Sequence, residues 1–113
     1  MENIVHLKEP VIHEFDYDEE IAGSLKSIDL NIKYYKNEEI LEKLIKKYID
    51  ELYNFNGKFL GEIEIFPEQI QRKVLHIIVP NIKLSDSQIK AINSALDYAK
   101  SKDIYLNIIV GID

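Results

Sequence analysis

The chain contains no cysteine, which excludes disulfide bonds, thiolate zinc sites and cysteine nucleophiles. It also lacks any apolar run near the roughly 20 residues that a membrane-spanning helix needs, so we expect no membrane partner. Residues 1–6 lack a basic stretch followed by an apolar one, so we expect no signal peptide. These absences are compatible with a protein that acts in the reducing cytoplasm, which is the localisation we expect.

Excess positive charge is missing as well. The chain has 14 Lys and Arg residues against 20 Asp and Glu residues, which gives a net charge of −6. Proteins that coat nucleic acid without sequence preference neutralise phosphates with Lys and Arg, so this balance argues against a generic coat. It remains compatible with a nuclease whose acids gather around a metal ion, or with a module that binds a basic protein. No glycine-rich phosphate loop and no Gly-x-Ser-x-Gly elbow is present.

Regular patterns begin with two short strands. The 113 residues contain no repeat, low-complexity segment or linker rich in Pro and Gly, so residues 1–113 are interpreted as a single domain. Residues 11–17 and 24–32 predict a β-hairpin with a connecting loop at residues 18–23. Residues 60–66 alternate between apolar and polar side chains, which predicts a further half-buried strand.

Two amphipathic helices follow from the spacing of apolar residues. The first begins after Asn37, a good N-cap, and extends to about residue 53; the second begins with a capping box at residues 85–88. Residues 73–80 are almost continuously apolar, as in an inner strand covered on both faces, and residues 104–110 predict the closing strand. Strand, helix and strand have the length of one βαβ unit, so the two strands should be parallel. The predicted fold class is α/β, with a mixed four- to five-stranded sheet, two main helices, an N-terminal β-hairpin and a C-terminal βαβ unit.

The hairpin carries an acid, Asp16, on its first strand and Lys26 on its second. The segments around these residues, and others that follow in order up to about residue 110, resemble the C-terminal endonuclease toxin domain of contact-dependent inhibition and related polymorphic toxins. The later segments that carry the resemblance are Tyr48-Ile49-Asp50 with Phe55, residues 74–80 and residues 91–99.

This resemblance implies a PD-(D/E)XK-like fold and metal-dependent cleavage of nucleic acid, either RNA, with tRNA foremost, or DNA. It also implies Mg or Mn as the cofactor and a cognate immunity protein as a partner. Asp16 falls on the metal-binding acid of the pattern, Lys26 on its catalytic lysine, and Ser24 on the position two residues before the lysine. Because the pattern has a second acid where this chain has Ser24, the motif is incomplete and the domain could be degenerate. The pattern also has a first acid on a helix upstream of the hairpin, for which Glu2, Glu9 or Glu14 could substitute, and nothing in the sequence selects among them.

The chemistry explains why these residue types matter together. Magnesium prefers hard oxygen ligands, and a lysine beside it stabilises the charge that develops on phosphate or helps to form hydroxide. Asp16 and Lys26 can act together only if strand pairing puts them on the same face of the sheet, and a slip of one residue would separate them. The simpler alternative is a cross-strand ion pair, and the acidic run around Asp18 is interpreted as a solvated turn. Of the histidines, only His13 is a candidate acid–base residue, because it lies near Asp16 in the sequence.

A basic and aromatic cluster outside the regular elements is a candidate nucleic-acid contact. It consists of Lys33, Tyr34, Tyr35 and Lys36. Tyrosine rings can stack on bases, although a loop that packs against the sheet explains the same residues.

Three classes of function therefore compete. The first is a metal-dependent nuclease toxin domain. The second is a non-catalytic acidic module, an inhibitor or assembly subunit derived from a nuclease, which would bind a basic protein. The third is a homo-oligomer whose edge strand pairs with its copy. The sequence does not fix the oligomeric state.

Overall fold

The protein is described here by a computed structural model that covers residues 4–7, 11–60 and 63–111. Its centre is a five-stranded sheet with the order β1-β2-β3-β6-β7. Those strands are β1 (Ile4–His6), β2 (Glu14–Asp16), β3 (Ile21–Ser27), β6 (Arg72–Val79) and β7 (Ile104–Val110). β1, β2 and β3 pair antiparallel, whereas β3, β6 and β7 are parallel. The predicted α/β class and the parallel βαβ pairing are confirmed.

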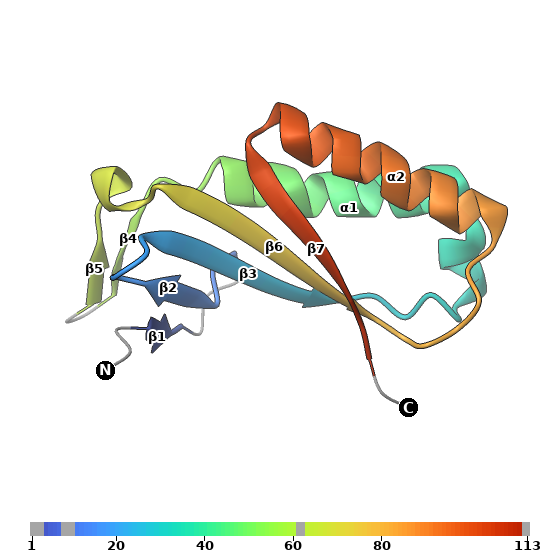
Figure 1. Ribbon diagram of the computed structural model, residues 1–113, viewed down its shortest axis with the longest axis horizontal. Coiled ribbons are helices and arrows are strands. Elements are labelled where there is room, and N and C mark those ends of the chain that lie inside the picture. Colours follow the sequence, from blue (N-terminus) through green and yellow to red (C-terminus); the bar gives the residue numbers. More distant parts are fainter. Residues whose placement is uncertain (1–3, 8–10, 61–62, 112–113) are drawn as a thin grey trace.

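Both long helices lie on one face of this sheet (Figure 1). Helix α1 (Glu38–Tyr53) begins where the side chain of Asn37 accepts a hydrogen bond from the Ile40 backbone N–H at 3.0 Å. Helix α2 (Asp86–Ser101) begins with the predicted capping box between Ser85 and Gln88. No helix in the described part of the chain has the length and apolar character required to cross a membrane.

The hydrophobic core fills the space between the helices and the sheet. Helix α1 contributes large buried residues at the predicted spacing, whereas α2 contributes mainly alanines, which allow close approach of its backbone. The buried residues of the two helices are Leu41, Ile45, Ile49 and Leu52 in α1 and Ala91, Ile92, Ala95 and Ala99 in α2.

The two faces of the sheet differ in cover. The helix face, as we name the side packed on α1 and α2, includes Leu75 and Ile77 of β6, which are fully buried. The opposite side, named the open face, carries the alternate residues of the same strand, of which Val74 and His76 are only partly buried. The prediction that residues 73–80 are covered on both faces is therefore wrong, because both long helices pack on one side.

Strand bounds also differ from those predicted. The predicted hairpin strands at residues 11–17 and 24–32 differ at both ends: β2 covers only Glu14–Asp16, and β3 begins at Ile21, earlier than predicted, and ends at Ser27. A short strand, β1, was not predicted. In place of one strand at residues 60–66 there is a separate two-stranded sheet, formed by β4 (Lys58–Leu60) and β5 (Ile63–Ile65). The described residues also form two 3₁₀ helices, η1 (Lys33–Lys36) and η2 (Pro67–Gln69).

Candidate functional site

Strand register decides which of the predicted site residues meet. Asp16 of β2 pairs with Ile21 of β3, and Lys26 lies five positions after Ile21. Side chains alternate between the faces of a strand, so an odd separation puts Lys26 on the face opposite to Asp16. Asp16 lies on the open face and Lys26 on the helix face, so the structure does not bring them together. Asp16 and Lys26 could act as a metal ligand and its neighbouring lysine only on one face of the sheet, and this condition is not met.

Asp16 has a structural role in the turn that follows it. Its Oδ1 atom accepts hydrogen bonds from the backbone N–H groups of Asp18 at 2.9 Å and Glu19 at 3.0 Å. Such side-chain bonds to the next residues are typical of aspartate at the start of a turn. The same turn holds Glu20 at a φ of +58°, a conformation that non-glycine residues rarely adopt. The carboxylate of Asp16 is thus partly occupied in shaping the β2–β3 connection.

Asp16 also borders a hollow on the open face together with Glu14. The hollow has a volume of about 320 Å³, and its floor includes Gly23, which has no side chain to fill it. A Cβ atom built on Gly23 would lie 2.9 Å from Cγ of Glu14, so the Glu14 side chain lies over this glycine. Glu14 and Asp16 are therefore two carboxylates on one face of one strand.

Lys26 lies on the other side, against helix α1. Its Nζ atom is 4.9 Å from the centroid of the Tyr48 ring, within the range of a cation–π contact. Ser24 lies two residues before it on the same face and is only 2% exposed. The Ser24–Lys26 pair is thus held between β3 and the helix, with the serine at the buried end.

His13 adjoins this pair rather than Asp16. Its Nδ1 atom accepts a hydrogen bond from the Leu25 backbone N–H at 2.9 Å. Because Nδ1 is an acceptor there, the neutral ring carries its proton on Nε2 and presents an N–H donor. Burial and, second, the positive charge of Lys26 lower the pKa of His13 below its ordinary value, which favours this neutral form. Sequence reasoning considered His13 only for its nearness to Asp16, and missed its proximity to Lys26.

The aromatic segment η1 borders the same side of the molecule. Tyr34 and Tyr35 form an edge-to-face pair with ring centroids 5.6 Å apart. Tyr34 is 62% exposed, whereas Tyr35 packs against the core.

Burial raises the pKa of Tyr48, and the electrostatic influence of Tyr35 and Glu51 adds to this rise. Tyr48 and Glu51 are three residues apart on α1 and were not predicted as site residues, since their spacing is that of any helix face.

The donors available for a metal ion are divided between the two faces. Among the described residues, no three His, Cys, Asp or Glu side chains gather as a ligand set. The groups around Lys26 supply a hydroxyl, an ammonium and an imidazole N–H, which do not fit a divalent cation. Glu14 and Asp16 are of the type that magnesium takes, with water and phosphate oxygens as its remaining ligands. They lie on the open face, away from Lys26.

Comparisons with known proteins agree with this architecture. A family model described as a CDI toxin restriction endonuclease-like domain matches residues 2–109. A solved structure titled as a CdiA-CT/CdiI toxin and immunity complex from Yersinia pseudotuberculosis contains a chain with a similar fold, with a TM-score of 0.80 and 20% sequence identity. That likeness covers 96% of this chain and 87% of the other. The search of curated proteins gave no match.

Proposed function

The chain belongs to the family of CDI toxin restriction endonuclease-like domains, and from this membership we propose that it cleaves phosphodiester bonds in nucleic acid. The cut is assigned to the helix face, at Lys26. The proposed substrate is RNA, with tRNA as the first to be tested, and the proposed place of action is the cytoplasm. The observation that carries the proposal is the position of Lys26 against the Tyr48 ring, with the His13 imidazole hydrogen-bonded to the backbone N–H of the preceding residue, Leu25.

The chemistry of cleavage explains why this arrangement is suitable. When water, or in RNA the neighbouring 2′-hydroxyl, attacks a phosphodiester, the bond from phosphorus to the leaving oxygen breaks and negative charge builds up on the non-bridging oxygens. An ammonium group and an N–H donor that are already in position stabilise that charge without reorganising. In this proposal Lys26 supplies the ammonium and His13 supplies the Nε2–H.

We also propose a site for a divalent metal, Mg or Mn, at a location separate from Lys26. Asp16 and Glu14 would hold it on the open face, where it would supply a positive charge for a phosphate oxygen. Because these acids and Lys26 lie on opposite faces of the sheet, a metal held there would be separate from the groups at Lys26.

A cleavage assay with two matched variants tests the proposal. Purified protein is incubated with tRNA, single-stranded RNA and duplex DNA, in Mg, in Mn and in a chelator. We expect Lys26→Ala to lower the rate by about 100-fold or more, because it removes a group that acts on the transition state. Asp16→Asn keeps an oxygen that accepts the turn hydrogen bonds but would weaken a metal site on the open face, so we expect a rate within about threefold of the parent in the chelator. Intact substrate under every condition, or a loss of cleavage in Asp16→Asn but not in Lys26→Ala, would overturn the proposal.

We also propose a cognate immunity protein as a partner, because the solved relative with this fold comes from a toxin and immunity complex. A non-catalytic acidic module is the second candidate function. It is favoured by the net charge of −6 and by the use of Asp16 in a turn. That candidate predicts a stable complex with a basic protein and no cleavage by the parent chain.

A further inference from the structure

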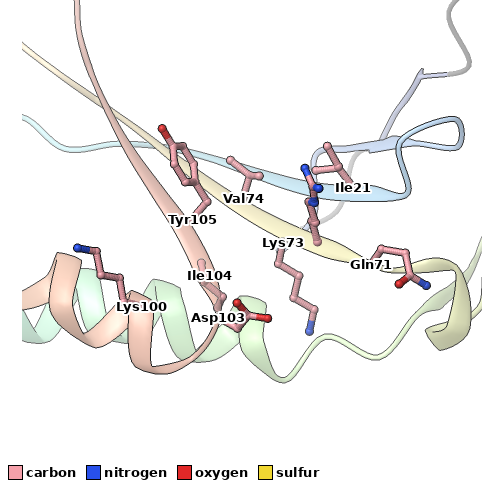
Figure 2. A pocket seen from close by; sticks show the side chains of 9 residues that line it. Ile21, Gln71, Lys73, Val74, Lys100, Asp103, Ile104 and Tyr105 are labelled. Atoms are coloured by element: carbon pink, nitrogen blue, oxygen red, sulfur yellow. The ribbon is translucent and has the colours of Figure 1, made fainter.

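A second cavity lies at the edge of the sheet where the parallel strands β6 and β7 begin. It has a volume of about 550 Å³ and is named here the edge pocket. Its polar and aromatic lining consists of Gln71, Arg72, Lys73, Lys100, Asp103 and Tyr105. Figure 2 shows Tyr105 and Lys100 on one side of this pocket and Gln71 on the other. None of these residues belongs to the proposed centre at Lys26.

The edge pocket concentrates positive charge in an acidic chain. Three of its lining residues are cations and one is an acid, whereas the whole chain has a net charge of −6. Lys73 is already engaged, since its Nζ atom donates to two backbone carbonyls at the end of α1. Arg72 and Lys100 are exposed, and neither has a carboxylate of the described residues within 4.0 Å. Two cations are therefore available to an anionic ligand.

An exposed aromatic ring adjoins these cations. Tyr105 is 66% exposed and is the β7 partner of Val74 in β6, so both lie on the open face. Arg72 is two residues before Val74 and therefore lies on the same face. An aromatic residue that stands on a sheet beside Arg and Lys is the arrangement by which many proteins bind single-stranded nucleic acid: bases stack on the ring, and the cations follow the backbone. An acidic peptide would use the cations, but it would give the exposed ring no specific role.

We propose that the edge pocket binds a single-stranded segment of nucleic acid, with phosphates on Arg72 and Lys100 and one base stacked on Tyr105. The proposal takes its ligand class from the proposed function. It adds a binding subsite that is separate from Lys26 and that holds the substrate away from the cleaved bond. Loss of this subsite should weaken binding and leave the chemical step unchanged.

Fluorescence polarisation with a labelled single-stranded oligonucleotide tests the inference in a Lys26→Ala background, so that the probe stays intact. We expect Tyr105→Ala to weaken binding about tenfold, because base stacking is lost, and Tyr105→Phe to bind as the parent does. Arg72→Gln and Lys100→Gln should each weaken binding and reduce the slope of log Kd against log salt by about 0.7. Lys90→Gln removes the same charge from an exposed position of the same helix, α2, and should bind within about twofold of the parent.

Several outcomes would overturn the inference. They are the absence of binding at low salt, equal affinities for the pocket variants and the Lys90→Gln control, and equal losses in Tyr105→Ala and Tyr105→Phe. A pocket variant that binds the oligonucleotide normally but fails to bind an acidic partner protein would overturn it too. Binding and cleavage are measured separately, so a chain that binds without cutting contradicts the proposed function alone. If the edge-pocket variants cut normally and bind the oligonucleotide with unchanged affinity, only the proposed role of the edge pocket is contradicted.

Discussion

The two faces of the central sheet are built from the same strands but have different surroundings. On the helix face, Leu75 and Ile77 are buried, and the partly buried Lys26 of β3 lies against the Tyr48 ring of α1. On the open face, the alternate residues Val74 and Tyr105 border hollows that solvent reaches. The comparison teaches that neighbouring residues of one strand serve different ends: one set stabilises the fold and the candidate centre, and the other remains available to ligands.

Truncation of a core residue should give the largest difference between the faces. Leu75 is 0% exposed, so Leu75→Ala removes buried methyl groups and leaves a cavity, which we expect to lower the free energy of unfolding by about 2–5 kcal/mol. Val74→Ala, one residue away on the open face, should cost less than about 1 kcal/mol. Urea unfolding followed by circular dichroism measures both values. Equal losses would mean that the open face is covered as well.

The neighbouring cations Arg72 and Lys73 allow a smaller but sharper comparison. Lys73 donates to the carbonyl oxygens of Tyr53 and Phe55, both at 2.7 Å, and so binds the end of α1 to β6. Lys73→Met keeps most of the side-chain stem but removes these charged hydrogen bonds, so we expect a loss of about 1.5–3 kcal/mol. Arg72→Met on the open face should change stability by less than about 0.5 kcal/mol. If urea unfolding gives the same value for both, the Lys73 bonds do not stabilise the fold.

The helices and the parallel strands could be predicted from the sequence because each leaves a local signal. Asn37 and Ser85 mark helix starts by their capping chemistry, and the apolar period carries each helix to its end. The face of the sheet on which the Asp16 side chain lies could not be predicted. It depends on whether Asp16 pairs with Ile21 or with a neighbour, and a difference of one residue in the turn reverses the result.

The approach of His13 to Lys26 could not be predicted for a related reason. It depends on a hydrogen bond from the Leu25 backbone to the imidazole ring, between residues 12 positions apart. Nothing in the local sequence specifies such a bond. The sequence therefore predicts which side chains could take part in the chemistry. The strand register is needed to decide on which face of the sheet each of them lies.

The smallest expected effect, a titration, tests the helix-face assignment most directly. Burial and, second, the charge of Lys26 lower the pKa of His13, so its NMR titration should have a midpoint below the usual value of about 6.5. Lys26→Met should raise that midpoint only in part, because burial is the larger cause. An unchanged midpoint in Lys26→Met would mean that the lysine does not act on His13.

The same shift has a consequence for stability, with a sign that can be stated in advance. A histidine with a lowered pKa in the folded state binds its proton more readily when the chain unfolds. Stability should therefore fall as the pH drops below about 6.5, the unfolded value, and the loss should stop below the folded pKa of His13. His13→Asn keeps an acceptor for the Leu25 N–H but cannot titrate. When the pH is lowered through this window, the thermal midpoint of the variant should therefore fall less than that of the parent. Parallel decreases in parent and variant would show that burial and Lys26 do not hold His13 in its neutral form.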